Sequence, residues 1–260
     1  MNYETILYSI EEKICTITLN RAEKRNSFNP QLVADLKSAF KSAEDEASVK
    51  VIILKAEGEV FSAGADLAYL QSLQNNSYDE NLADSQSLME LYKLIYTLSK
   101  PVIAQIEGAA IAGGCGLAAV CDFAIAVHEA QFGYTEVRIG FVPAIVMVFL
   151  LRKISERNAK ELLLTGKLIS ALKAKEIGLI NEVVPKKIIA ETVLNFAKEI
   201  ILHTSRASLK STKQMIAAVQ EMTLDEALNH ACEINALARA TDDCKNGIQA
   251  FLDKKKPVWE

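Results

Sequence analysis

At the centre of the chain lies the stretch Ile106-Glu107-Gly108-Ala109-Ala110-Ile111-Ala112-Gly113-Gly114-Cys115-Gly116-Leu117-Ala118-Ala119-Val120-Cys121-Asp122. The largely apolar run before it, Pro101-Val102-Ile103-Ala104-Gln105, predicts a buried strand. A strand that leads through a glycine turn into a helix presents unpaired backbone N–H groups at the positive end of the helix dipole. Glycine has no Cβ and lets a ligand approach closely. The stretch therefore predicts a site for negative charge, either a phosphate or an oxyanion.

The phosphate alternative has support in the sequence. Gly114-x-Gly116-x-x-Ala119 satisfies the relaxed dinucleotide fingerprint, and Glu136 follows twenty residues after Gly116. However, that fingerprint normally opens the first strand–helix unit of its domain, and here about a hundred residues precede it. Cys121-Asp122 also ends the helix too early for a crossover helix. A Walker loop is excluded because no Gly-Lys-Ser/Thr follows. A turn that serves only close packing is the remaining alternative.

An earlier segment has the same organisation. Residues 51–56 form a β-branched strand, and Phe61-Ser62-Ala63-Gly64-Ala65-Asp66 leads from it into a helical pattern. Asp66 is suited to cap that helix. Two backbone N–H donors from two such turns, aimed at one oxygen, form an oxyanion hole. The pair of turns therefore favours the oxyanion interpretation.

Together with three further segments, these turns resemble the crotonase family, the enoyl-CoA hydratases and isomerases. The matching segments occur in family order and are residues 17–29, 61–66, 108–122, 131–136 and 247–254. The resemblance implies an α/β fold in which β-β-α units coil into a spiral over residues 1–205. Residues 206–260 would form a helical C-terminal region that builds a homotrimer, with two trimers stacked as a hexamer in many members.

The resemblance also implies catalytic positions. The backbone N–H groups of Ala65 and Gly113 would hold the thioester oxygen of an acyl-CoA, and Glu136 would exchange protons. Glu136 follows the apolar run Gln131-Phe132-Gly133, and burial raises a carboxyl pKa towards neutrality. The alternative is an ion-paired glutamate, with Arg138 on the same side of a strand.

The expected CoA-binding positions lie in the same turns and at two basic residues. The resemblance places Lys254 on the CoA phosphates from the same or a neighbouring subunit, although a solvated helix end is the alternative. The full set of CoA-binding positions is Arg25, Ala63, Ala65, Asp66, Gly113 and Lys254. The acyl pocket is less determined, because each candidate is equally suited to the core. Those candidates are Tyr69, Met89, Tyr92 and Phe141.

Position 116 departs from the best-studied hydratases, which have Gly-Gly-Cys-Glu-Leu-Ala where this chain has Gly113-Gly114-Cys115-Gly116-Leu117-Ala118. Glycine cannot transfer a proton, so one carboxylate must suffice or another residue must assist. Single-carboxylate relatives include enoyl-CoA isomerases and hydratases of branched acyl groups. Residues 136–144 resemble the methylglutaconyl-CoA hydratases. We therefore expect reversible hydration of a branched or carboxylated 2-enoyl-CoA, as in leucine degradation or fatty acid metabolism, with 3,2-isomerisation as the alternative.

Composition limits the other classes. The chain has 260 residues, a net charge of −4 and 50% hydrophobic residues. No apolar run reaches the roughly 18–20 residues of a membrane helix, and no secretory signal opens the sequence. The acidic balance disfavours a nucleic-acid partner or an RNA-binding scaffold. We expect a cytoplasmic enzyme with no membrane association.

Cysteine and histidine usage indicates no metal site. Five cysteines without ligand spacing predict reduced thiols, and no histidine stands in a recognisable relation to Cys115 as a nucleophile. The enolate mechanism implied by the resemblance needs no cofactor beyond the CoA thioester itself.

Periodicity predicts the coarse element order. Residues 71–80 are polar and aperiodic and indicate a loop. A capping box at Thr223 and Glu226 predicts a helix start within a wholly helical tail. The expected strands are 15–19, 51–56, 102–106 and 123–126, and the expected helices are 30–46, 81–97, 207–222, one from 223, and 242–254.

Overall fold

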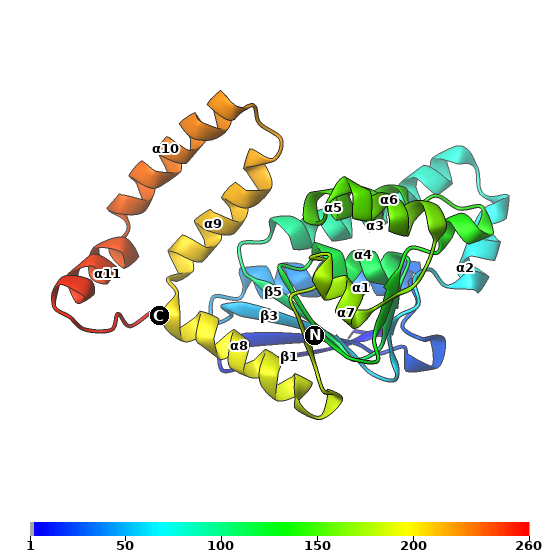
Figure 1. Cartoon of the computed structure of the whole chain (residues 1–260), viewed down its shortest axis with the longest axis horizontal. Helices are drawn as coiled ribbons and strands as arrows, with labels where there is room; N and C mark the ends of the chain where they lie inside the picture. Colours follow the sequence, from blue (N-terminus) through cyan, green and yellow to red (C-terminus); the bar gives the residue numbers. More distant parts are fainter. Residues whose placement is uncertain (1–2, 260) are drawn as a thin grey trace.

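A computed structural model describes residues 3–259 and shows two β-sheets wrapped by helices (Figure 1). The larger sheet has the strand order β1-β2-β3-β5-β7-β10 and is parallel except for the β1–β2 pair. Its strands are β1 (Ile6–Glu11), β2 (Ile14–Leu19), β3 (Val51–Ala56), β5 (Val102–Ile106), β7 (Phe123–Val127) and β10 (Glu182–Val184). The four strands expected from periodicity are all present.

A second, smaller sheet carries the chain towards the turns of interest. It has the order β4-β6-β8-β9, and β4, β6 and β8 are mutually parallel. Its strands are β4 (Val60–Ser62), β6 (Ala109–Ile111), β8 (Gln131–Gly133) and β9 (Ile169–Ser170). Long strand, short strand and helix recur in that order, which confirms the spiral of β-β-α units.

The same topology argues against a dinucleotide-binding fold. Along the larger sheet the strands follow chain order from β1 to β10, so there is no point at which the order reverses. The helix after the glycine turn, α4 (Gly113–Val120), has only 8 residues. The phosphate interpretation of that turn is therefore wrong.

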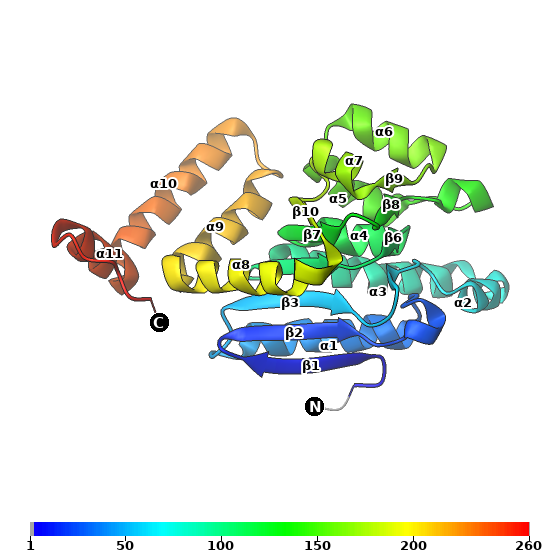
Figure 2. The ribbon, with the colours of Figure 1, turned by 60° about the horizontal axis from the view of Figure 1, so that its bottom comes forward.

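Helices cover the sheets on both sides (Figures 1 and 2). The amphipathic helix expected at 30–46 is α1, whose first turn is capped by Asn29. The remaining helices of this part are α1 (Pro30–Asp45), α2 (Leu67–Ser72), α3 (Tyr78–Thr97), α5 (Ala144–Lys153), α6 (Glu156–Thr165), α7 (Ala171–Glu176) and α8 (Ile189–His203).

The loop expected over residues 71–80 is wrong. Helix α2 continues to Ser72, a 3₁₀ turn follows, and α3 begins at Tyr78, three residues before the expected start. The cause is a capping box: Ser77 accepts from the backbone N–H of Glu80, and the Glu80 carboxylate accepts from the Ser77 N–H at 2.7 Å. The box lies within a polar stretch where no apolar periodicity points to a helix.

Three helices complete the chain: α9 (Arg206–Val219), α10 (Leu224–Ala240) and α11 (Asp242–Leu252). The expected capping box of Thr223 and Glu226 opens α10. In both views α10 and α11 lie away from the sheets, on the side opposite α2 (Figures 1 and 2). The division at 205/206 stays a prediction, and its outer bounds, residues 1–2 and 260, lie outside the described residues.

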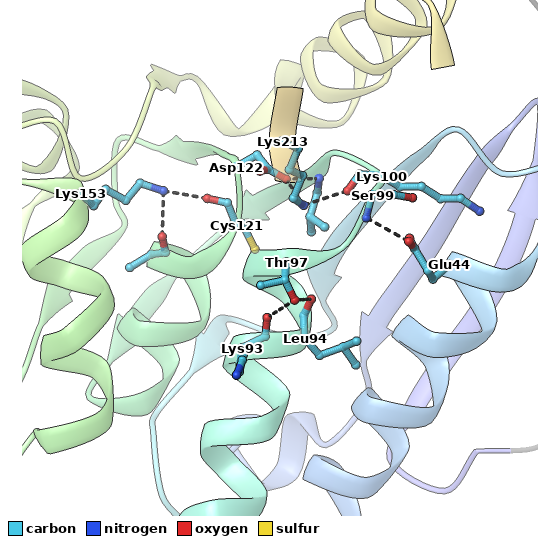
Figure 3. Close-up of polar contacts among 12 residues, drawn as sticks. Glu44, Lys93, Leu94, Thr97, Ser99, Lys100, Cys121, Asp122, Lys153 and Lys213 are labelled. Atoms are coloured by element: carbon cyan, nitrogen blue, oxygen red, sulfur yellow. Dashed lines mark hydrogen bonds and ion pairs between the residues drawn. The ribbon is translucent and has the colours of Figure 1, made fainter. Parts of the chain in front are cut away.

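Two lysines with little solvent exposure, Lys213 and Lys153, fix α9 and α4 to the core (Figure 3). Lys213 on α9 donates to Asp122 Oδ2 at 2.6 Å and to the Lys100 carbonyl at 2.9 Å. Lys153 on α5 donates to the carbonyls of Ala119 and Cys121 at 2.9 and 2.8 Å. These carbonyls end α4, where a cation is favoured by the helix dipole. The short helix is therefore held at its C-terminus.

Over residues 3–259, none of the helices combines the length and the apolar character that crossing a membrane requires.

Candidate active site

Three turns meet at one edge of the smaller sheet. Strands β4, β6 and β8 are parallel neighbours, so their carboxyl ends lie at the same edge. Ala65, Gly113 and Glu136 each follow within three residues of one of these ends. Residues that are up to 71 positions apart in sequence are thus placed side by side by strand register. All three are the catalytic positions expected from the sequence.

The two glycine-containing turns are in contact. A Cβ added to Gly64 would lie 2.8 Å from the Ala112 Cβ and 3.4 Å from the Gly113 nitrogen. Gly64 has φ +85°, a conformation that favours glycine. Only glycine fits here, because the second turn occupies the space of a side chain. The close approach brings the Ala65 and Gly113 backbones to one place.

Both expected N–H donors are free of acceptors within the described chain. Phe28 pairs with the Ala65 segment through Phe28 N–H to the Gly64 carbonyl and Asp66 N–H to the Phe28 carbonyl, at 2.7 and 2.9 Å. The Ala65 N–H takes no part in this pairing. Gly113 is the first residue of α4, where N–H groups have no intrahelical partner.

The residue before Gly113 is strained. Ala112 has φ 52° and ψ −123°, which residues with a Cβ rarely adopt. Its N–H donates to the Gly133 carbonyl at 2.8 Å, which ties this turn to the strand that leads to Glu136. Strain of this kind costs about 1–3 kcal/mol and is concentrated at functional sites. Here it directs the start of α4 towards the other two turns.

Glu136 is buried, with 8% of its surface exposed. Burial raises the pKa of its carboxyl group above the ordinary range. Its Oε2 atom is buried and has no hydrogen-bond partner among residues 3–259. A buried carboxyl oxygen without a partner is costly, and such costs are typical of groups that act on a substrate.

The alternative interpretation of Glu136 does not hold. Glu136 opens the 3₁₀ helix η3 (Glu136–Ile139) and is not on a strand, so Arg138 does not share its face by strand alternation. Arg138 is exposed, and no ion pair to Glu136 is formed within the described chain. The Arg138 side chain instead packs beside Gly166, whose added Cβ would lie 3.0 Å from Arg138 Cγ.

Cys115 is not a nucleophile. It is wholly buried in the first turn of α4, and burial raises the pKa of its thiol to about 12. At neutral pH the thiol is therefore protonated, and the protonated form is a poor nucleophile.

The space that a side chain at Gly116 would need is occupied by Val146. A Cβ at this position would lie 2.3 Å from Val146 Cγ1 and 3.0 Å from Val146 Cβ. Val146 belongs to α5, which packs directly against α4. The space that a carboxylate side chain would need at position 116 is therefore closed by the core.

Introducing that carboxylate should be destabilising. We expect Gly116→Glu to lower the free energy of unfolding by about 1–3 kcal/mol or more, because it overpacks the α4–α5 contact and buries an unpaired carboxylate. Adding Val146→Ala should restore part of the loss. Urea unfolding measures both, and a Gly116→Glu variant as stable as the parent would contradict the packing described.

The expected CoA-binding positions divide into two groups. The Arg25 carbonyl accepts from the Ala63 N–H at 3.0 Å, so Arg25 borders the first turn. Asp66 caps α2 as expected and pairs with Arg21 at 3.3 Å. Lys254 is exposed and follows directly after α11, the helix that lies on the opposite side of the molecule from α2 (Figures 1 and 2). Within one chain Lys254 is therefore not brought to the site.

The four acyl-pocket candidates are also separated. Tyr92 is wholly buried and donates to the Gly113 carbonyl at 2.7 Å, whereas Phe141 is 55% exposed. The Tyr69 hydroxyl donates a hydrogen bond to the Asp84 carboxylate on α3. Met89 lines a cavity of about 670 Å³ between α3, α5 and α9, which does not include Glu136. The path of an acyl group stays a prediction.

Sequence reasoning missed Val146, Phe28 and Arg21. Each acts through a contact between elements far apart in the chain, and none stands in a motif of its own. The sequence shows that position 116 is a glycine, but it does not show that Val146 fills the space a side chain there would need.

Among residues 3–259, no group of three or more His, Cys, Asp or Glu side chains is placed to hold a metal ion. Two strand–turn–helix segments, at Ala65 and Gly113, and a buried carboxyl group at Glu136 follow neighbouring parallel strands. Such an arrangement is suited to reactions that pass through an oxyanion.

Comparison with known proteins supports the resemblance found in the sequence. The sequence model described as enoyl-CoA hydratase/isomerase matches residues 9–260. A Thermus thermophilus protein provisionally named an enoyl-CoA hydratase is 40% identical, over 94% of this chain and 96% of its own. The crotonyl-CoA hydratase of Syntrophomonas wolfei is 34% identical, over 98% of both chains. The crystal structure of a Mycobacterium smegmatis enoyl-CoA hydratase superposes with a TM-score of 0.94 at 30% identity, over 98% and 99% of the two chains.

The chain therefore belongs to the enoyl-CoA hydratase/isomerase family, whose members are enzymes that act on acyl-CoA thioesters. The resemblance and the fold expected from the sequence are confirmed.

Proposed function

We propose that this enzyme adds water reversibly to the double bond of a 2-enoyl-CoA, with Glu136 as the single catalytic carboxylate. The observation that carries the proposal is the meeting of Ala65, Gly113 and Glu136 at the ends of three parallel strands. Val146 leaves no room for a second carboxylate at Gly116. Relatives that align over nearly their whole length are named hydratases, which favours hydration over 3,2-isomerisation.

In the proposed mechanism the N–H groups of Ala65 and Gly113 bind the thioester oxygen. Negative charge accumulates on that oxygen as the enolate forms, so both hydrogen bonds strengthen in the transition state. Glu136 takes a proton from water as the water oxygen bonds to C3. The same carboxyl group, or the water it holds, then returns a proton to C2. Atoms and charge balance without a metal or a redox cofactor.

We propose a branched or carboxylated acyl group, as in 3-methylglutaconyl-CoA. The support is the resemblance of residues 136–144 and an exposed Arg138 that forms no ion pair within residues 3–259. One relative, from Escherichia coli and 31% identical, is named a 2,3-dehydroadipyl-CoA hydratase.

Mass spectrometry of products tests the proposal. The purified enzyme is incubated separately with 3-methylglutaconyl-CoA, crotonyl-CoA and a 3-enoyl-CoA. Gain of one water on the first two, faster on the branched ester, is the expected result. An isobaric conversion of the 3-enoyl ester without water gain on any ester would instead identify a 3,2-isomerase.

We propose that a trimer, or a hexamer of two trimers, completes the site in the cytoplasm. The helices α10 and α11 expose Leu224, Leu228, Leu237, Ile248, Phe251 and Leu252. Exposed apolar area of this extent is typical of a subunit interface. Because Lys254 lies far from its own site, it would reach the CoA of a neighbouring subunit.

Charge reversal tests the two proposed phosphate contacts. Arg25→Glu and Lys254→Glu should each raise KM for a CoA ester several-fold, because a phosphate contact is replaced by repulsion. The same ester of pantetheine, which lacks these phosphates, serves as the control substrate. Equal changes in KM for both esters would remove the phosphate role.

A further inference from the structure

Phe28 connects to both proposed oxyanion donors. Its backbone holds the first turn, because the Phe28 N–H donates to the Gly64 carbonyl and its carbonyl accepts from Asp66, at 2.7 and 2.9 Å. Its ring reaches the second turn: a Cβ on Gly113 would lie 3.4 Å from Phe28 Cδ2. One residue thus contacts the Ala65 turn by its backbone and the Gly113 turn by its side chain.

Tyr92 holds the second turn from the other side. Its hydroxyl donates to the Gly113 carbonyl at 2.7 Å and would lie 3.2 Å from a Cβ on Gly113. Burial, together with the nearby Glu136 carboxyl, raises the pKa of Tyr92, so the hydroxyl keeps its proton and remains a donor. The ring is wholly buried, which leaves no solvent to replace this bond.

The two aromatic rings pack against each other. Phe28 and Tyr92 meet edge to face, with centroids 6.5 Å apart and an interplanar angle of 84°. Tyr92 also meets Phe149 edge to face, with the centroids 6.1 Å apart. Close-packed rings in a core resist displacement, so the Phe28–Tyr92 contact has little freedom to vary.

We propose that Phe28 and Tyr92 are a positioning pair that sets the spacing between the Ala65 and Gly113 N–H donors. The proposal rests on the oxyanion role of these two donors in the proposed function. In this proposal both rings act through the backbone segments that they hold. A misplacement of about 1 Å in such a site can cost about 10²-fold in rate. The pair should therefore affect the transition state more than ground-state binding.

The chain provides a matched control one helical turn further along α3. Tyr96 is also a tyrosine, and its ring meets Phe149 with the centroids 5.4 Å apart. Its hydroxyl is buried and has no hydrogen-bond partner among residues 3–259. Tyr96→Phe therefore makes the same chemical change as Tyr92→Phe, in the same aromatic row, without removing a hydrogen bond.

Two measurements test the pair. Steady-state hydration of crotonyl-CoA gives kcat and KM. Infrared difference spectra of bound butyryl-CoA, labelled at the thioester carbon, report how strongly the donors polarise the carbonyl, and this saturated ester cannot be hydrated. Both are applied to the wild type, Tyr92→Phe, Tyr96→Phe, Phe28→Leu and the Phe28→Leu/Tyr92→Phe double variant.

We expect Tyr92→Phe to lower kcat about tenfold or more with KM within about twofold, and to reduce the shift of the carbonyl band. Tyr96→Phe should leave both unchanged. The double variant should lose less than the product of the single losses, because the residues act as a unit. If Phe28→Leu does not fold, the comparison of Tyr92→Phe with Tyr96→Phe tests the positioning role of Tyr92 by itself.

A Tyr92→Phe variant that matches Tyr96→Phe in kcat and band shift would overturn the pair, as would a change in KM alone. The infrared measurement on bound butyryl-CoA distinguishes failure of the positioning proposal from failure of the proposed hydration. A wild type that polarises the carbonyl but hydrates no ester would refute hydration, and the response of the band to Tyr92→Phe would still decide the positioning role.

Discussion

Replacing Glu136 by glutamine should lower kcat for hydration by about 10²–10⁴-fold with little change in KM. The amide has nearly the same shape as the carboxyl group but cannot exchange a proton. Because Val146 fills the space beside Gly116, that position cannot supply the second carboxylate found in the best-studied hydratases. Loss of crotonyl-CoA absorbance measures the rate. Glu90→Gln, at an exposed position on α3, is a matched control that should keep full activity.

The same variant should be more stable than the parent at neutral pH. Burial raises the folded-state pKa of Glu136, so the carboxyl group favours folding below its unfolded-state pKa. That contribution is lost as pH rises through the raised folded-state pKa. Glu136→Gln carries no such charge, so its Tm should exceed that of the wild type at about pH 8 and approach it at about pH 4. A lower Tm at both pH values would show that the carboxylate is paired and not desolvated.

Replacing Gly113 by proline should lower kcat by about 10²–10³-fold, because proline has no N–H to donate to the developing oxyanion. Proline is compatible with the first position of a helix, and Gly113 is the first residue of α4. Gly113→Ala is the matched control: it keeps the N–H and adds a Cβ that meets the Tyr92 hydroxyl at 3.2 Å.

Circular dichroism and Tm must show that both Gly113 variants fold. A folded proline variant with wild-type kcat would remove Gly113 from the oxyanion hole. An alanine variant as slow as the proline variant would attribute the loss to the Cβ and not to the missing donor.

The long strands could be predicted from the sequence because burial on both faces gives them continuous apolar runs, as in residues 51–56 and 102–106. The strands of the smaller sheet could not. Strands β4, β6 and β8 have 3 residues each, too few for any period to show. Only the family resemblance implied these short strands. Their parallel pairing nevertheless aligns the three turns of the candidate site.

The candidate site residues could be placed in the structure from the sequence where their position depends on a local turn. Gly113 and Ala65 stand in strand–turn–helix segments, and Glu136 follows an apolar run. The supporting contacts of Val146, Phe28 and Tyr92 could not be predicted, because they join α5, the segment before α1 and α3 to α4. Lys254 is placed at the site only if a second subunit supplies it, which no pattern within one chain determines.

The most direct test of the proposed chemistry is oxygen transfer from labelled water. The wild type and Glu136→Gln are incubated with crotonyl-CoA in H₂¹⁸O, and the products are analysed by mass spectrometry. We predict that the wild type yields a 3-hydroxyacyl-CoA with one ¹⁸O at C3, and that Glu136→Gln yields almost none in the same time. Equal incorporation by the two proteins, or none by the wild type, would contradict hydration through a single catalytic glutamate.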